Sequence, residues 1–310
     1  MNVIKQAFKS LFTSSSCEVE SPIPIISKDK ADLLNAIKSE GVIGLLAGNG
    51  PFPFEFIAGA KKEGCKVASV CYEGEADREL ENHCLSTDWV KIGQLGKMIK
   101  AFKLRKVKYV ALAGGISRVK HFGDVKVDAR GAKMLLRIRS AKDDAIMRGL
   151  ADELAKDGIQ VVDCTIFLSN CLATQGLLAG PRLREKELQD IEVGVEAIKA
   201  MSSQHIGQLV VVKDGVVVAV EAVEGTDATI LRGGELGGKG CVVVKFAKTT
   251  QDMRFDVPTI GIKTIDSLKE VKARVIALEA GRSLIVNKQE VFDAAKAAGI
   301  SIIGCESLVS

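Results

Sequence analysis

An acidic cluster follows a long apolar run in the second half of the chain. Glu221 lies at the end of the apolar run 216–222, and the three residues Glu224, Thr226 and Asp227 follow it in the segment 221–227, EAVEGTD. Because an apolar run of this length packs in a core, the polar residues at its end are held in fixed positions. The three residues are therefore candidates to bind a metal ion or a substrate, and helix capping by Thr226 and Asp227 is the alternative.

A second charged segment, QDMRFDV at 251–257, alternates charged with apolar side chains. Since successive side chains of a strand point to opposite faces, the spacing predicts a strand that carries Asp252, Arg254 and Asp256 on one face. Mg²⁺ prefers one or two carboxylates together with phosphate oxygens, and an arginine binds a phosphate through two N–H groups. The pattern thus indicates a site for a cation and a phosphate, although a surface ion-pair ladder is the commoner use of it.

Further polar residues end other apolar runs of the second half. Glu279 ends the run 275–278, which favours a carboxylate-lined cleft in this part of the chain. Lys245 ends the run 241–245 and would supply positive charge to a bound diphosphate, with a solvated lysine as the alternative. The glycine-rich segment 233–240, GGELGGKG, is expected to form a loop, either a lid or a plain connection.

Two glycine-rich segments follow apolar runs in the first half. GNG at 48–50 follows the run 42–47, and GGI at 114–116 follows the run 107–113. In an open α/β sheet, ligands bind outside the carboxyl ends of the strands, where glycine lets main-chain N–H groups approach a phosphate. The candidate substrate-binding residues of this half are therefore Gly48, Asn49, Gly50, Gly114, Gly115 and Ile116, and Arg118 would add a phosphate contact.

The dinucleotide-binding fingerprint is incomplete. Gly48-x-Gly50 is present, but Pro53 stands where the third glycine belongs, and the chain has no phosphate-binding loop of the G-x-x-x-x-G-K-[ST] type. Glu73, at the end of the second apolar run, stands where an acid that binds a ribose is expected. A dinucleotide-dependent oxidoreductase is therefore kept as an alternative function.

The elements that must position these residues predict an α/β fold of two domains. Between 41 and 168, apolar runs alternate with helical patterns, which is typical of βαβ units and of a Rossmann-like, mostly parallel sheet. The second half contains a helix at 185–201, a hairpin at 208–222 around Asp214-Gly215, and further short strands, which favour an α+β domain. The expected organisation is an N-terminal extension at 1–40, an α/β domain at 41–168, a linker at 169–184 and a catalytic α+β domain at 185–310.

Composition narrows the function classes. The net charge is only +4 and aromatic residues are 5% of the chain, so nucleic acid is not expected as a partner. The eight cysteines form no C-x-x-C pair, which favours reduced, mostly buried thiols and a cytoplasmic protein. Residues 3–12 carry apolar side chains at helical spacing with lysines between them, so peripheral contact with the inner membrane, a targeting segment and a docked terminal helix all remain open.

Several stretches resemble the LpxI-type UDP-2,3-diacylglucosamine pyrophosphatases of lipid A biosynthesis, from about Val42 to Glu306. The similar stretches are IGLLAGNGPFP (43–53), ALAGGISR (111–118), VDARG (127–131), DDAIMRGL (143–150), IGQLVVVKDGVVVAVEAVEGTDATILR (206–232), QDMRFDVPTIG (251–261) and IALEAGRSLIV (276–286). The chain departs from the family pattern at Val119, at Thr229 and at 248–249. Val119 and Thr229 are expected to bear on the fit of the sugar or the acyl chains.

The resemblance implies Mg²⁺-dependent hydrolysis of UDP-2,3-diacylglucosamine to UMP and 2,3-diacylglucosamine 1-phosphate, with water directed at the β-phosphorus. On this view the lipid-linked nucleotide sugar is held between two domains. Asp256, Asp227 and Arg254 are the candidate catalytic residues, and Thr226 and Lys245 join the glycine-rich segments in binding the substrate. The candidate Mg²⁺ ligands are Asp256, Asp227, Asp252 and Glu224. A non-catalytic carrier of the same lipid is a further alternative.

Overall fold

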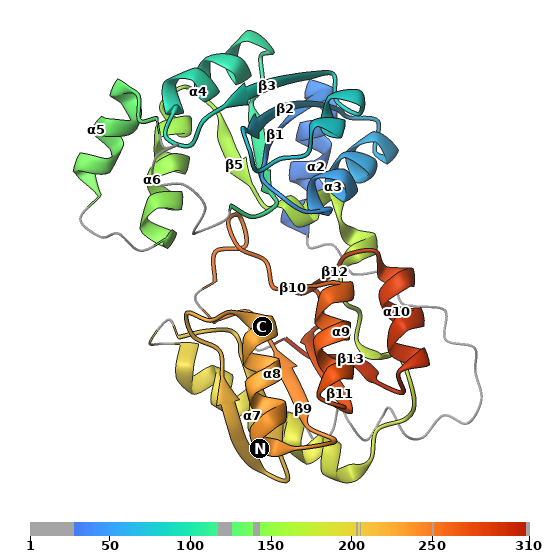
Figure 1. The fold of residues 1–310 in the computed structure, drawn as a ribbon. Coiled ribbons are helices and arrows are strands. Elements are labelled where there is room, and N and C mark those ends of the chain that lie inside the picture. The colour runs from blue at the N-terminus through green and yellow to red at the C-terminus, as the bar shows by residue number, and fades with distance from the viewer. Residues whose placement is uncertain are drawn as a thin grey trace. The chain divides into compact units, whose positions relative to one another are not determined.

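The computed structural model describes residues 28–116, 126–138, 143–202, 204, 206–249 and 251–307. These residues divide into two compact units. The first unit comprises the described parts of Ile26–Leu168 together with Met253–Phe255, and the second comprises the described parts of Ser169–Asp252 and Asp256–Ser310. Each unit is an α/β structure, so the predicted fold class is confirmed (Figure 1).

The first unit is a parallel sheet covered on both faces. Its elements are α2 (Lys28–Glu40), β1 (Val42–Ala47), α3 (Phe52–Lys62), β2 (Lys66–Tyr72), η1 (Arg78–Asn82), β3 (Ser86–Val90), α4 (Leu95–Leu104), β4 (Tyr109–Ala113), α5 (Ala129–Arg137), α6 (Asp143–Ala155), β5 (Gln160–Val162) and η2 (Cys164–Phe167). The described strands lie in the order β3-β2-β1-β4-β5, and every pair of neighbours is parallel. The predicted Rossmann-like sheet is therefore confirmed, and its strand order reverses between β1 and β4.

Helices on both faces explain why the strands of this unit read as unbroken apolar runs. Figure 1 shows α2 and α3 on one face of the sheet and α4, α5 and α6 on the other. Leu45 of β1 and Phe56 of α3 are fully buried, as is Leu154 of α6. A strand that is buried on both faces has no polar face to present, so its sequence shows no alternation.

The first unit differs from the expected elements at two places. The run 159–167 is not one strand, because only Gln160–Val162 pairs with β4. Asp163 then accepts a hydrogen bond from the Thr165 amide at 2.8 Å, which starts η2 and ends the strand. At the other end, 28–40 of the expected extension forms α2, and its Ile37 is fully buried. The helix predicted over 3–12 lies outside the described residues.

The second unit is built on a mixed sheet. Its elements are η3 (Ser169–Cys171), β6 (Gly176–Ala179), α7 (Glu185–Ser202), β7 (Leu209–Lys213), β8 (Val216–Val220), α8 (Thr226–Gly237), β9 (Val242–Lys245), β10 (Thr259–Ile260), α9 (Ile262–Glu270), β11 (Val275–Glu279), β12 (Leu284–Ile285), α10 (Lys288–Ala297) and β13 (Ser301–Cys305). The described strands of the main sheet lie in the order β6-β13-β11-β9-β7-β8, and β10 pairs with β12 apart from it. The expected linker at 169–184 thus contains β6, which pairs with β13.

The strand directions place four strand ends at one edge of this sheet. β9, β11 and β13 are parallel to one another, and β7 is antiparallel to both β8 and β9. The carboxyl ends of β8, β9, β11 and β13 therefore meet at the same edge. The predicted hairpin is confirmed, with Asp214 and Gly215 at φ of 47° and 81°, as a tight two-residue turn requires.

Helices also cover both faces of the mixed sheet. One apolar cluster joins the strands to α7 through Ile191 and Ile198. The other joins them to α8, α9 and α10 through Ile230, Leu268 and Val291, all of them fully buried. The charged ends of the strands are thus held by a core on each side.

The glycine-rich segment 233–240 is not the expected loop. Most of it continues α8, which ends at Gly237 and is followed by Gly238 at φ 70°. The glycines allow close packing, because a Cβ on Gly233 would lie 2.6 Å from Val211 Cγ2 and one on Gly234 would lie 2.2 Å from Val271 Cβ. The helix can approach β7 and α9 only where side chains are absent, so these glycines serve packing.

The strand predicted over 251–257 is wrong, since this segment contains a turn and no strand. The Asp256 amide donates to the Asp252 carbonyl at 3.3 Å, and the Gln251 amide donates to the Lys248 carbonyl at 2.9 Å. Pro258 has no N–H to give to a sheet ladder, and the first strand after it is the two-residue β10. Local turn bonds replace the ladder, so the alternation of charged residues here does not define a sheet face.

Seven cysteines lie in the described residues, and all are free thiols. Six of them are buried and Cys84 is partly exposed, which confirms the predicted buried thiols for this part of the chain. Among the helices that the structure describes, none has the length and apolar character needed to span a bilayer.

Candidate functional site

The glycine-rich segments after β1 and β4 are hydrogen-bonded to each other at the point where the strand order reverses. The Gly48 amide donates to the Ala113 carbonyl at 2.9 Å, and Asn49 and Gly115 exchange main-chain hydrogen bonds of 2.8 and 3.2 Å. A Cβ on Gly48 would lie only 2.1 Å from the Gly115 carbonyl oxygen. Three of the expected phosphate-binding amides are therefore engaged within the protein.

Other groups of the same segments remain open to a ligand. The amides of Gly50 and Ile116 make no hydrogen bond to another described residue, and Ile116 is 43% exposed. Gly50 has φ 89° and open space around it. Asn49 Nδ2 donates to Glu75 Oε2 at 2.9 Å, which fixes this side chain beside them. The predicted crevice thus offers Gly50 and Ile116 as main-chain donors, and Arg118 lies outside the described residues.

A buried lysine stands at the carboxyl edge of the mixed sheet. Lys245, the last residue of β9, is only 4% exposed. Its Nζ donates to Thr226 Oγ1 and to the Thr259 carbonyl, both at 2.9 Å. The Thr226 hydroxyl in turn donates to Glu221 Oε1 at 2.9 Å, and Glu221 Oε2 accepts from the Gln208 amide at 3.0 Å. A hydrogen-bonded chain therefore runs from Glu221 through Thr226 to the lysine.

Charge and burial act against each other at this lysine. Burial lowers the pKa of Lys245, while the negative charges of Glu221, Asp256 and Asp227 act to raise it. All three carboxylates must lie close enough to act on the ammonium, because Coulombic interactions fade with distance and screening. Hydrogen bonds therefore join Lys245, Thr226 and Glu221, and the charges of Asp227 and Asp256 act on the same ammonium.

The N-terminus of α8 opens onto the same group of residues. Gly225 is the N-cap at φ 83°, and no side chain caps the helix. The first intrahelical amide is that of Thr229, which donates to the Gly225 carbonyl at 3.1 Å, so the preceding amides have no intrahelical acceptor. This end of a helix carries partial positive charge and favours an anion. Capping by Thr226 or Asp227, the alternative considered from sequence, is therefore not what these residues do.

One departure from the family pattern lies in the same helix. Thr229 is fully buried, and its hydroxyl donates to the Gly225 carbonyl at 2.8 Å. The Thr229 side chain is therefore satisfied inside the protein and helps to fix the start of α8. Val119, the other departure expected to bear on ligand fit, lies outside the described residues.

Glu224 has a different use from the one expected. Its Oε1 forms an ion pair with Arg232 Nη2 at 2.5 Å, and its Oε2 accepts from the Ala222 amide at 3.1 Å. The pKa of Glu224 is lowered first by a hydrogen bond from its own main-chain amide and then by Arg232. The carboxylate thus supports the turn that leads into α8.

The turn at 251–257 separates residues that the expected strand would have aligned. Asp256 Oδ2 accepts from Gln251 Nε2 at 2.6 Å, and the Arg254 guanidinium carbon lies 4.8 Å from the centroid of the Phe255 ring. Met253–Phe255 belong to the first unit, whereas Asp252 and Asp256 belong to the second. The shared-face argument for Asp252, Arg254 and Asp256 therefore fails, and proximity to Lys245 is what remains for Asp256.

The acid at the end of β11 does not line a cleft. Glu279 is fully buried, and its carboxylate binds the Ala247 amide at 2.9 Å, Ser307 Oγ at 2.6 Å and Arg282 Nη1 at 3.3 Å. Such a set of partners satisfies the charge inside the protein. In the part of the chain that the structure describes, no group of three or more His, Cys, Asp or Glu is arranged to hold a metal ion.

Two residues of this site were not found from the sequence. Glu221 was noted only as part of an acidic run, and the Thr259 carbonyl carries no side-chain pattern at all. Glu221 becomes evident from the sheet order, in which β8 and β9 flank β7 with their carboxyl ends at one edge, whereas Thr259 belongs to β10, which pairs with β12 apart from this sheet. An acid directly after one apolar strand and a lysine ending another were the available indication.

Comparison with known proteins gives matches to both halves of the chain. A family model of the LpxI N-terminal domain matches residues 42–171, and one of the LpxI C-terminal domain matches residues 174–303. The UDP-2,3-diacylglucosamine pyrophosphatase LpxI of Caulobacter vibrioides is 32% identical over 275 residues, which cover 85% of this chain and 97% of that protein. A crystal structure of a biotin carboxylase complex from Campylobacter jejuni covers 64% of this chain and 43% of its own at 12% identity, but its TM-score of 0.26 carries no argument.

Proposed function

The chain belongs to the LpxI family, and we propose that it hydrolyses UDP-2,3-diacylglucosamine to UMP and 2,3-diacylglucosamine 1-phosphate. The observation that carries this proposal is the match of both domains in order, together with a relative of that named activity that is matched over 97% of its length. Binding and hydrolysis of a diphosphate ester require a fixed cation, main-chain N–H donors and carboxylates. The described residues supply these groups at one strand edge. No observation favours the oxidoreductase or the carrier.

We assign binding of the diphosphate to Lys245, Thr226 and the first turn of α8. Lys245 has three N–H donors, and two of them are used by Thr226 and Thr259, so one remains for a phosphate oxygen. The main-chain amides at the start of α8 have no intrahelical acceptor, so they add further N–H donors for the phosphate. Because these groups are held by buried partners, they need little reorganisation when charge develops on the diphosphate.

Asp256 is assigned to orient the attacking water, with Asp227 beside it. Both carboxylates act on the Lys245 ammonium, so they lie near the proposed phosphate site. A carboxylate within hydrogen-bond reach of a water can hold its proton as the water attacks the β-phosphorus. Arg254 is assigned to the charge that develops on the diphosphate, because a guanidinium can bind a phosphate through two N–H groups.

The residues fit Mg²⁺ only in a limited sense. Mg²⁺ is commonly held by one or two carboxylates and completed by substrate phosphates and water, rather than by a cage of protein ligands. Asp256 and Asp227 would hold it, because Glu224 is paired with Arg232 and no larger carboxylate group lies in the described residues. When bound, the ion polarises a phosphoryl oxygen and lowers the pKa of water. We propose Mg²⁺ dependence on this basis.

The first unit is proposed to bind the nucleotide at the point where its strand order reverses. The Gly50 and Ile116 amides lie outside the carboxyl ends of β1 and β4, where ligands of open α/β sheets bind. We further propose that the protein acts in the cytoplasm, in peripheral contact with the membrane that holds its lipid substrate.

The test is release of UMP from UDP-2,3-diacylglucosamine by the purified full chain, with Mg²⁺ and with EDTA. We expect UMP and the lipid monophosphate in equal amounts, and release that stops with EDTA and resumes when Mg²⁺ is added back. Release that is unaffected by EDTA would contradict the proposed metal, and substrate that binds without release would favour the carrier.

A further inference from the structure

The positive charge of this protein is concentrated in one segment of the first unit. Between Lys91 and Arg137 the chain has 13 of its 43 Lys and Arg residues but only two of its 39 Asp and Glu residues. This segment therefore carries a formal charge of +11 and the rest of the chain carries −7, which together give the net charge of +4. Such asymmetry points to an anionic partner.

The described part of this segment forms α4, β4 and α5, and α4 and α5 pack against each other. Five of its cations form ion pairs with acids elsewhere in the unit, namely Lys103, Arg105, Lys108, Arg130 and Arg137. Asp128, the one described acid between Lys91 and Arg137, caps α5 by accepting from the amides of Arg130 and Gly131. It also accepts from the Gly96 amide of α4 at 2.7 Å. Its charge is thus used at two helix N-termini. Lys100 of α4 and Lys133 of α5 are exposed and form no ion pair with a described acid.

The same two helices expose large apolar side chains. Leu136 is 88% exposed, Leu104 is 68% exposed and Leu135 is 44% exposed. On α5 the buried residues are Gly131 and Met134, so Leu136, two positions after Met134, points away from the domain. Lysines and leucines therefore share the outer surface of α4 and α5, which we call the basic surface.

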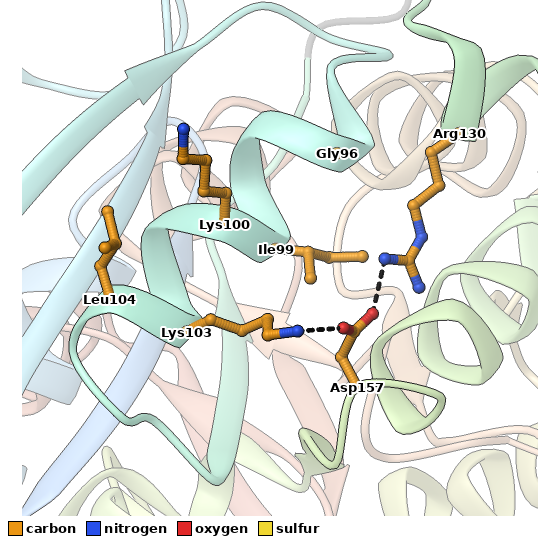
Figure 2. Close-up of a pocket in the computed structure, with 7 residues that line it drawn as sticks. All are labelled: Gly96, Ile99, Lys100, Lys103, Leu104, Arg130 and Asp157. Carbon is orange, nitrogen blue, oxygen red and sulfur yellow. Dashed lines mark hydrogen bonds and ion pairs between the residues drawn. The ribbon is translucent and has the colours of Figure 1, made fainter.

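A pocket of about 350 Å³ lies beside α4 in this surface (Figure 2). Figure 2 shows Lys103 of α4 and Arg130 of α5 both directed at Asp157. The two ion pairs are 2.6 and 2.5 Å long. Lys100 and Leu104 line the same pocket and are not bound to that acid. The pocket is thus lined by three cations and one anion, and Arg130 is also paired with Glu153, so Lys100 is the lining cation without an ion pair to a described acid. The buried Ile99 lines it as well.

We propose that the basic surface docks the protein on a bilayer of anionic phospholipid. Cations attract the headgroups, and the exposed leucines enter the boundary of the acyl chains, as at amphipathic helices that lie in a membrane interface. Nucleic acid would instead call for aromatic side chains on which bases stack, and the exposed apolar residues here are leucines. The proposal rests on the proposed function in one respect, because the substrate of that function is a membrane lipid.

The test is recovery of the full chain with vesicles of phosphatidylcholine alone and of phosphatidylcholine with phosphatidylglycerol. We expect binding only to the anionic vesicles, weakened by high salt. Lys100→Glu with Lys133→Glu should weaken it by about tenfold or more, and Leu136→Ser by about fivefold. The matched controls, Lys62→Glu with Lys186→Glu and Leu236→Ser, change exposed residues outside this surface and should bind as the unaltered protein does.

Other results would overturn the proposal. Equal recovery with both vesicle types would remove the charge argument, and surface variants that bind like the controls would assign any docking to another part of the chain. Binding of duplex DNA that is lost in the same variants would identify a nucleic-acid partner instead. Activity on detergent-dispersed substrate should be unchanged in all variants. If the unaltered protein releases no UMP there, the proposed function fails while the vesicle result still decides the docking surface.

Discussion

Lys245 Nζ lies 2.9 Å from Thr226 Oγ1, and the Thr226 hydroxyl directs its own proton to Glu221. The lysine is held at the end of a fully buried strand, and the threonine begins a helix whose first amides are open. Two consecutive elements, α8 and β9, thus present a fixed cation and a positive helix end to one place. The predictions for Lys245 variants depend on this hydrogen-bonded arrangement of Lys245, Thr226 and Glu221.

Replacing Lys245 with Met should abolish most activity without unfolding the protein. Loss of one preorganised donor to a developing oxyanion costs about 10²–10³ in rate. Methionine fills the space of the lysine chain, but Thr226 and the Thr259 carbonyl lose their donor and Glu221 loses a nearby cation. We therefore expect kcat/KM to fall by about that factor and the urea unfolding midpoint to fall while the protein stays folded in water. Near-normal turnover in this variant would contradict the assigned role.

The loss of activity at alkaline pH should follow the deprotonation of Lys245. Burial lowers its pKa below the ordinary 10.5, so activity that needs the ammonium is lost as pH rises through this lowered pKa. Lys245→Arg keeps its charge at any such pH. The alkaline limb should therefore move to higher pH in this variant, whatever the level of its activity.

The free energy of unfolding should rise with pH in the range where activity falls. Between the lowered folded-state pKa and 10.5, the unfolded chain binds more protons than the folded protein, so stability rises with pH in this window. Lys245→Met removes the titrating group, and this rise should be absent from its urea unfolding curves. A rise of equal size in both proteins would assign it to other groups.

Asp256 and Glu224 should differ sharply although both were candidate metal ligands. Asp256→Asn should lower kcat by about 10²–10⁴ while substrate is still bound, because it removes the carboxylate that orients water. Glu224→Gln should keep kcat near normal and lower stability slightly, since Glu224 pairs with Arg232 at a partly exposed site. Turnover and equilibrium binding of substrate measure the two effects. Equal loss of turnover in both variants would return Glu224 to the site.

Gly48 should be essential for the fold of the first unit. A Cβ there would lie 2.1 Å from the Gly115 carbonyl oxygen, and main chain cannot move aside as a flexible side chain can. We expect Gly48→Ala to destabilise the protein by about 2–4 kcal/mol in urea unfolding. Gly261→Ala is the control, because nothing lies within 4 Å of its Cβ position, and it should change little.

Some of the fold follows from local pattern and some does not. The apolar runs that became β1 and β2 were recognisable because a strand covered on both faces has no polar residues. Asp214-Gly215 identified the hairpin because its two positive φ values suit those residues. α4, α5 and α9 were not singled out. The composition of 233–240 predicts a loop, whereas close packing on Val211 and Val271 requires its glycines within a helix.

The candidate site was predicted in part for the same reason. Thr226, Asp227 and Lys245 follow apolar runs, so their place at a strand edge or helix start was accessible from the sequence. The turn at 251–257 was misjudged, because alternation of charge in seven residues does not distinguish a strand face from a turn with its own hydrogen bonds. Glu221 needed the sheet order, which no local pattern contains.

The most direct measurement is turnover of UDP-2,3-diacylglucosamine in ¹⁸O-labelled water, with mass analysis of both products. The proposal requires UMP and 2,3-diacylglucosamine 1-phosphate, with one ¹⁸O atom in the phosphate of the lipid, because water attacks the β-phosphorus. Label in UMP would place the attack on the α-phosphorus and contradict the assigned arrangement. Absence of both products, with the substrate still bound, would contradict the proposed hydrolysis itself.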